Sequence, residues 1–328
     1  MQVFDQVSFD KWQEIADKCE YATFFHTLAW SKIFVETYPK MKIATKKFVF
    51  DDGSVAIFPL VKIKKRMGLF NSHVSNVAGT YGGWISEKNL SEKQINEMIK
   101  WINKNLKDLT WRVNPFDIKL RDISIPNMQK DFTQYLDLKQ GFDSIYKLWT
   151  KRHSSVARKA RKARKEGVLI KQADLWEDWR QYFEIYQDSI KRWGNSVSSK
   201  YPIELFKNLF QEQSKNIKLW LAYFEEKPIA GALCFYHNHH VVYWHGAALE
   251  NYFFKKPSNL LQYEIIKDAC ENNYWWYDFN SSGGHEGVMK FKKSFGTEKI
   301  SSNIITRQCK PYKIIKSVCN NFKRHKKV

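Results

Sequence analysis

Cysteine is scarce in this sequence. Five of the 328 residues are cysteine, an odd number scattered from Cys19 to Cys319. Their spacing fits neither a disulfide framework nor a zinc site, so we expect free thiols that are buried or have no chemical role. No apolar run approaches the ~18 residues that a membrane span needs. The N-terminus also lacks the charged-then-apolar pattern of a signal peptide. These absences predict a cytoplasmic protein.

Acidic residues are missing from two segments of the chain. Residues 151–165 contain eight basic residues and no acidic one, and residues 310–328 contain seven and none. Together the two segments supply +15 of the net charge of +20. The basic character is therefore local, which suggests one or two anionic contacts and not a generally adhesive surface.

The remaining composition is that of a globular protein. Apolar residues make up 43% of the chain and aromatic residues 16%, which is ample for packed cores and too much for disorder. A length of 328 residues favours two domains over one.

The order of predicted elements occurs twice. Each half reads as two helices, a hairpin, a third strand, a helix and another strand, with little sequence identity between the halves. In the first half these segments are residues 9–18, 28–38, 42–50, 54–63, 70–85, 91–106 and 110–113, with Thr27 as a possible N-cap. In the second half they are residues 175–192, 202–213, 217–224, 229–236, 241–249, a helix from Pro257, and 274–279.

This pattern predicts domains and a place for the chemistry. We predict an α/β (α+β) fold with a first domain over residues 1–128, a second over 131–310 that contains the basic helix 151–165, and a basic tail over 311–328. The last strand–helix–strand unit should be a βαβ unit with two parallel strands. Ligands bind beyond the carboxyl ends of such strands, so we expect the chemistry in the loops 250–259 and 280–295.

Four stretches resemble the Fem family, whose members have two GNAT-like acyltransferase domains and add amino acids to peptidoglycan precursors. They are Phe25 to Trp30, the basic run Arg161 to Val168, Pro228 to Ala232, and Tyr277-Asp278-Phe279 followed by Phe291-Lys292-Lys293-Ser294-Phe295-Gly296. The last pair is the most specific, and together the stretches span nearly the whole chain.

The resemblance implies that an acyl or aminoacyl group passes from an activated carrier to an amine. Its donor would be aminoacyl-tRNA, with no separate cofactor, and its acceptor a nucleotide- or lipid-linked envelope precursor. The loop after Leu249, ENYFFKKPSN, has no glycine. A glycine-rich turn there would let backbone N–H groups cradle the pyrophosphate of coenzyme A, so its absence argues against an acyl-CoA donor without excluding one.

Three residues are candidates for the chemistry, because transfer to an amine needs a stabilised oxyanion and a place for a proton. Lys292 and Lys293 lie in the family's motif and could stabilise the carbonyl oxygen, and we favour Lys292. They could equally be solvated surface lysines. Asp278 lies within the apolar strand YWWYDF. It is either catalytic or a carboxylate that caps a nearby loop or pairs with a basic residue.

Four residues are candidates for substrate contact. Tyr243 and His245 could share one face of a strand, and Phe291 could anchor the lysine loop in apolar surface. Arg192 ends a long helix, where a cation complements the helix dipole, and the resemblance implies that it holds an acceptor phosphate. His237, His239 and His240 lie at a hairpin tip whose spacing does not suit a metal site. We therefore expect no metal.

The basic helix has two interpretations. Val156, Ala160 and Ala163 form a packing stripe, and the helix could otherwise simply be solvated. Repeated positive charges on a helix repel one another and destabilise it unless a bound anion neutralises them. We therefore expect Arg158, Arg161, Lys162 and Lys165 to bind the phosphates of a tRNA, a nucleotide-sugar or an anionic membrane surface.

Three functions are open at this point. The first is a Fem-like aminoacyl- or acyltransferase of cell-envelope biosynthesis. The second is a coenzyme A-dependent N-acyltransferase of an amino sugar or lipid. The third is a basic nucleic-acid-binding protein without enzymatic activity, which would leave the repeated architecture unexplained.

Overall fold

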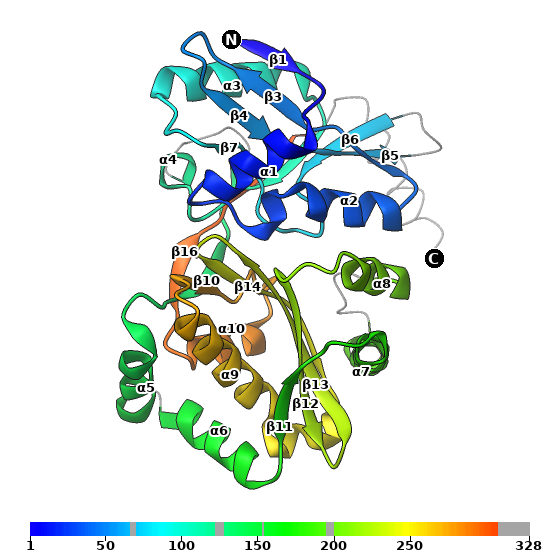
Figure 1. The fold of residues 1–328 in the computed structure, drawn as a ribbon, viewed down its shortest axis with the longest axis vertical. Helices are drawn as coiled ribbons and strands as arrows, with labels where there is room; N and C mark the ends of the chain where they lie inside the picture. Colours follow the sequence, from blue (N-terminus) through cyan, green and yellow to red (C-terminus); the bar gives the residue numbers. More distant parts are fainter. Residues whose placement is uncertain (66–69, 122–127, 153, 195–199, 308–328) are drawn as a thin grey trace, which may run out of the picture.

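The computed structural model describes residues 1–65, 70–121, 128–152, 154–194 and 200–307. The predicted basic tail, Cys309 and Cys319 lie outside this part of the chain. The described residues form two halves, one above the other in Figure 1.

The first half contains two sheets and four α-helices within the described residues. Its strands are β1 (Gln2–Phe4), β2 (Met41–Ile43), β3 (Lys46–Val49), β4 (Val55–Phe58), β5 (Val61–Lys65), β6 (Phe70–Ser75), β7 (Ile85–Ser86), β8 (Leu109–Arg112) and β9 (Met128–Gln129). Its helices are α1 (Phe9–Lys18), the 3₁₀ turn η1 (Phe24–His26), α2 (Leu28–Thr37), α3 (Glu92–Asn105) and α4 (Ile118–Arg121).

The second half contains one seven-stranded sheet. Its strands are β10 (Phe132–Asp137), β11 (Leu169–Gln172), β12 (Ile217–Phe224), β13 (Lys227–His237), β14 (His240–Ala248), β15 (Trp276–Asp278) and β16 (Glu298–Ser301); β17 (Ile304–Arg307) follows. Its helices are α5 (Gly141–Lys151), α6 (Ser154–Lys165), α7 (Trp176–Trp193), α8 (Ile203–Gln211), the 3₁₀ turn η4 (Glu250–Lys255), α9 (Pro257–Glu271) and α10 (Glu286–Lys293). Helices α7 and α8 cover one face of this sheet, and α9, with α5 and α6, covers the other (Figure 1).

The predicted repeat is confirmed at the level of strand order. One sheet has the order β2-β5-β6-β8-β17-β9, and six strands of the other have the order β12-β13-β14-β15-β10-β16. In both sheets the third and fourth of these strands are parallel and the other neighbours are antiparallel. The predicted parallel pairing of the last βαβ unit is therefore correct.

The equivalent strands come from different places in the chain. Strand β17 pairs with β8 and β9, so residues 304–307 add a strand to the sheet of the first half. They do not belong to the sheet of the predicted second domain, residues 131–310. The exact limits of the two domains remain a prediction.

Two long strands expected in the first half are each divided between two sheets. The segments 42–50 and 54–63 become the pairs β2/β3 and β4/β5. Both segments pass from one sheet to the other at the same point, where Ala44 N donates a hydrogen bond to Leu60 O at 2.8 Å. Pro59 lies at this change and has no N–H for a ladder bond, which explains the interruption.

Local signals for helices agree with the structure. The Thr27 side chain accepts a hydrogen bond from Trp30 N and caps α2, as predicted. Val156, Ala160 and Ala163 of α6 are buried, and α6 packs against α9. Cys19 and Cys234 are buried free thiols.

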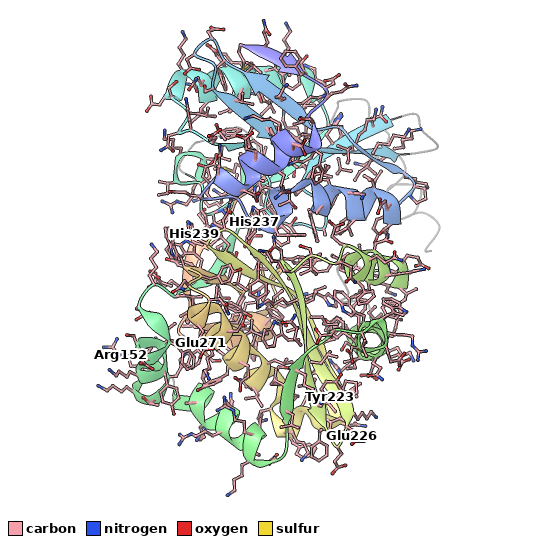
Figure 2. All side chains as sticks on the ribbon, in the orientation of Figure 1. Arg152, Tyr223, Glu226, His237, His239 and Glu271 are labelled. Carbon is pink, nitrogen blue, oxygen red and sulfur yellow. The ribbon has the colours of Figure 1, made fainter. Side chains whose placement is uncertain are left out.

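The two halves meet at the tip of the β13–β14 hairpin, where His237 and His239 are labelled in Figure 2. The Asn238 amide donates to Ala16 O and Cys19 O, both at 2.9 Å. His237 and His240 approach Ala16 O and Glu20 O, both at 3.1 Å. His237 and His240, which looked like part of a turn, therefore lie buried in this junction, whereas His239 is only partly buried.

Candidate active site

The parallel strands β14 and β15 part where the site is expected. They pair only over His240 to Val242 and Trp276 to Asp278. β14 continues to Ala248, while β15 ends at Asp278. The Tyr243 and Phe279 rings meet edge-to-face at 6.3 Å just beyond the last paired residues. The sheet is therefore open at the carboxyl ends of both strands, where ligands bind in such sheets.

Asp278 is fully buried at this opening. Its Oδ1 accepts hydrogen bonds from the Thr133 hydroxyl at 2.5 Å and from Asn280 N at 2.7 Å. Burial raises the pKa of Asp278, and the Thr133 and Tyr81 hydroxyls, Asn280 N and the Lys292 charge partly offset this. The geometry is that of a carboxylate holding the following loop, one of the two roles weighed for it. A catalytic role stays a prediction.

Lys292 lies on α10 and is 3% exposed. Its Nζ donates to Asn280 O at 2.7 Å and to Ser281 O at 3.2 Å, in the loop that leaves β15. Burial lowers the pKa of Lys292 to about 8, and the Asp278 charge acts in the opposite direction. A cation therefore lies at the carboxyl end of β15, as predicted, with a pKa near neutrality. Lys293 is exposed to solvent and shares none of these contacts.

Phe291 and Phe295 anchor the lysine segment in apolar surface. Phe291 is half-buried, Phe295 is fully buried, and their rings are 5.2 Å apart. The indole of Trp149, on α5, donates to Phe295 O at 2.8 Å. Lys292 therefore lies in a segment whose two ends are both held by packing.

Tyr243 and His245 pack into different clusters, which contradicts the expectation that they share one face of the strand. A bulge shifts the β13–β14 register between Leu233 and Cys234, so that Leu233 faces His245 and Cys234 faces Tyr243. Tyr243 packs with the cluster under α9. The extra residue breaks the strict alternation on which the prediction rested.

His245 faces α7 instead. Its Nδ1 is hydrogen-bonded to the Tyr182 hydroxyl at 2.6 Å, and its ring lies edge-on to Tyr186 at 4.5 Å. Burial lowers the pKa of His245 to about 3, so the ring is neutral near neutral pH. These contacts make His245 a structural partner of α7, and contact with a substrate stays a prediction.

Arg192 joins the end of α7 to the end of β14. Its Nη1 donates to Ala248 O at 3.2 Å, and its guanidinium lies 4.9 Å from the centre of the Phe253 ring. It also approaches Asp188 at 3.7 Å, one turn earlier on the helix. Arg192 is thus at the open end of the sheet, where an acceptor phosphate was predicted, but its hydrogen bonds go to protein.

The loop between β14 and α9 is filled with side chains. Residues 250–255 form the turn η4, and Lys256 precedes α9 with φ of 58°. The Lys255 ammonium lies 3.7 Å from the centre of the Phe224 ring. Phe253 and Phe254 are 42% and 57% exposed. The turn therefore places aromatic and basic groups where a coenzyme A enzyme needs bare backbone N–H groups.

The predicted polyanion-binding residues of α6 share one property, which is exposure to solvent. They are Arg158, Arg161, Lys162 and Lys165. Of the neighbouring cations, Arg164 is hydrogen-bonded to Glu264 and lies over the Tyr263 ring at 4.6 Å. Lys162 is 3.5 Å from Glu166. The helix thus presents a row of cations outside its packing stripe, as expected, while binding of an anion stays a prediction.

Two residues that act on the pKa of the Asp278 carboxylate were not among the site residues expected from the sequence. Thr133 comes from β10, and Tyr81 comes from the first half of the chain. Tyr81 is fully buried; burial and the Asp278 charge raise its pKa well above the ordinary value. The glycines after Tyr81 were the only local signal for this segment. Its contact with a residue 197 positions later leaves no local pattern.

Two features are absent from the described residues. No group of three or more His, Cys, Asp or Glu side chains is placed to hold a metal ion there. Likewise, none of the helices in the described ranges is both long enough and apolar enough to cross a membrane.

Comparison with known proteins agrees with this geometry. Residues 150–293 match the model of the acetyltransferase (GNAT) domain. The match lies within the second half of the chain. A search of the curated proteins finds no match to the sequence.

Solved structures extend the similarity beyond the GNAT domain. The crystal structure of FemX is similar over 96% of this chain and 100% of its own, with a TM-score of 0.72 and 13% identity. A C-terminal domain of a putative lysylphosphatidylglycerol synthetase from Agrobacterium fabrum is similar over 92% of this chain and 91% of its own, with a TM-score of 0.60 and 8% identity. L-PGS from Bacillus licheniformis is similar over 85% and 88%, with a TM-score of 0.52 and 11% identity. These similarities show that the whole chain has the tandem GNAT-like fold, and the GNAT domain makes the protein an acyltransferase.

Proposed function

We propose that the protein is a Fem-like aminoacyltransferase, which takes an aminoacyl group from aminoacyl-tRNA and forms an amide on an amine of a cell-envelope precursor. The amine nitrogen attacks the ester carbonyl, the C–N bond forms, and the C–O bond to the ribose breaks. The proton lost by the amine passes in net terms to the departing ribose oxygen. A peptidoglycan precursor is the acceptor that the family resemblance implies.

The observation that carries this proposal is the structure of the loop before α9. A coenzyme A donor needs a turn whose backbone N–H groups face the pyrophosphate. Here the turn η4 has no glycine, and Lys255 is fixed over Phe224 and donates to Glu166 O at 3.4 Å. The exposed rings of Phe253 and Phe254 beside Lys255 and Lys256 suit a single-stranded RNA end, because bases stack on aromatic side chains and lysines meet phosphates.

The opened sheet supports the transfer step. Lys292 places a buried positive charge beside Asp278 at the carboxyl end of β15. In a water-poor site a fixed cation stabilises the negative charge that develops on a carbonyl oxygen. In this proposal Lys292 supplies that charge.

The runner-up is a coenzyme A-dependent N-acyltransferase, which the match to an acetyltransferase domain favours. One experiment separates the two. The full chain is incubated with a mixed pool of charged tRNA or with acetyl-CoA, each with a panel of amine acceptors that includes muropeptide precursors. We expect mass spectrometry to find an aminoacyl increment on an acceptor with charged tRNA alone. Acetyl transfer without aminoacyl transfer would overturn the proposal.

A further inference from the structure

A cleft lies between the two halves, at the opposite end of the parallel strands from the opened sheet. It has a volume of about 590 Å³ and is lined by residues from both halves. His240 begins β14 and Trp276 begins β15, so the cleft is at the amino ends of these strands. His239, labelled in Figure 2, marks its position near the junction. Its volume falls within the roughly 300–1,000 Å³ that is usual for small-molecule sites.

Aromatic rings form one wall of the cleft. Trp275, which is 37% exposed, stacks on His239 with ring centres 3.5 Å apart. Trp276 lies 5.4 Å from Tyr135 and 5.7 Å from Phe116. Exposed and half-buried indoles in one cleft offer flat apolar surface to a ring.

Positive charge surrounds this wall. The Lys139 ammonium lies over both indoles, 5.1 Å from the ring centre of Trp275 and 4.4 Å from that of Trp276. Lys88 and Lys119 are exposed and also line the cleft. A ring that stacked on the indoles would displace the Lys139 ammonium, which could then reach a negative group on the same ligand.

Two acids line the cleft as well, and they are fewer than the cations. Glu20 is exposed, while the Asp117 carboxylate is buried and accepts a hydrogen bond from Leu120 N at 3.1 Å. Burial raises the pKa of Asp117 to about 6, so its negative charge is weakened in mildly acidic solution. The balance of charge in the cleft therefore favours an anion.

We propose that this cleft binds a small phosphorylated ring, a nucleotide or a sugar phosphate, whose ring stacks on Trp275 and Trp276 and whose phosphate meets Lys139 and Lys88. The proposal is independent of the transfer reaction, because none of these residues belongs to the opened end of the sheet.

Isothermal titration of the full chain tests this site. The probes are a nucleoside monophosphate, a hexose phosphate and inorganic phosphate. We expect one of the two ring phosphates to bind at least about tenfold more tightly than inorganic phosphate, because stacking on an aromatic side chain contributes about 1–3 kcal/mol. The preferred ring phosphate then identifies the ring. Equal binding of all three probes, or no binding of either ring phosphate, would refute the proposal.

Two pairs of variants locate the binding. Trp275→Ala should weaken binding of the preferred probe about tenfold, while Trp193→Ala, which removes an indole that is 40% exposed on α7, should not. Lys139→Gln should weaken binding and flatten its salt dependence, while Lys207→Gln, at an exposed position on α8, should leave both unchanged. Circular dichroism checks that each variant is folded. Equal losses in the members of either pair would contradict the assignment.

Discussion

Lys292 places a positive charge in a site that leaves it only 3% exposed. Its ammonium is held by two loop carbonyls and by the nearby Asp278 charge, while the adjacent Lys293 faces solvent. Two lysines that are neighbours in sequence therefore have different surroundings, and substitutions can separate their roles.

Lys292→Met should lower turnover at least about tenfold, because a fixed charge near the developing oxyanion contributes to the transition state. The variant should also melt at a lower temperature, since two loop carbonyls lose their donor and Asp278 loses its neighbouring cation. Steady-state rates and thermal melting are compared with those of Lys293→Met. If Lys293→Met loses activity while Lys292→Met keeps it, the exposed lysine has the role.

Turnover should fall as the pH rises through about 8, because Lys292, whose pKa burial lowers to about 8, loses its charge there. The same group does not destabilise the protein in that range. Its folded pKa lies below the unfolded value of about 10.4, so between these values the unfolded chain binds more protons and the stability contribution rises with pH. A pH–rate profile measured alongside melting temperatures makes the test. A rate that still rises through pH 8 after correction for deprotonation of the acceptor amine would show that neutral Lys292 is the active form.

Gly246 on β14 is needed for the packing of Tyr243. A Cβ at this position would lie 1.8 Å from the Tyr243 hydroxyl oxygen. Gly246→Ala should therefore lower the free energy of unfolding by about 1–3 kcal/mol. Gly287→Ala is the control, because its Cβ meets nothing within 4 Å and it lies within α10, where alanine is favoured by roughly 0.5–1 kcal/mol. Chemical denaturation measures both, and equal effects would reject the steric explanation.

At the scale of elements, α6 combines a buried stripe with an exposed basic surface. The stripe alone accounts for its packing against α9. It does not account for cations at successive exposed positions, which repel one another. Among the elements described, α6 is therefore the one that we expect a bound polyanion to stabilise most.

Replacing Arg158, Arg161, Lys162 and Lys165 with glutamine should weaken binding to tRNA and flatten its salt dependence. Each phosphate contact on a single strand contributes about 0.7 to the slope of log K against log salt, so the slope should fall by up to about 3. The control replaces four exposed lysines of the first half, Lys93, Lys100, Lys104 and Lys107, with glutamine. An unchanged slope in the α6 variant, or the same change in both, would show that α6 faces only water.

At the scale of the whole molecule, several contacts among the described residues join the two halves. Strand β17 returns to the sheet of the first half, the β13–β14 hairpin tip enters the first half, and Tyr81 reaches Asp278. Aromatic side chains also pack between the halves, with the Trp30 ring 5.0 Å from Phe235 and 5.4 Å from Trp244.

Asn238→Gly should lower the free energy of unfolding by about 1–3 kcal/mol, because it removes the amide that donates to Ala16 O and Cys19 O. Glycine is the appropriate replacement, since Asn238 has φ of 47°. Glu226→Gly is the control at the other, exposed hairpin end labelled in Figure 2, where φ is 65°. It should lose no more than about 0.5 kcal/mol. Similar losses in both variants would mean that the hydrogen bonds at the junction add nothing to stability.

The sequence by itself determined the local elements and their repeated order. The Thr27 cap, the stripe of Val156, Ala160 and Ala163, and the parallel strands around α9 were all readable from periodicity and end signals. These features depend on residues within a few positions of one another, or on the general rule that a crossover helix joins parallel strands. The positions of Lys292, Phe291 and Phe295 near the end of β15 followed from the same local order.

Only the tertiary structure decided which distant groups meet. The pairing of β17 with β8, the burial of His237 and the approach of Tyr81 to Asp278 each join segments far apart in the chain. The bulge that separates Tyr243 from His245 depends on the register with β13. Burial then set the charge properties of the site, because desolvation lowers the pKa of Lys292 and raises that of Asp278. Desolvation depends on all the atoms packed around a group, and a pattern of neighbouring residues carries no record of them.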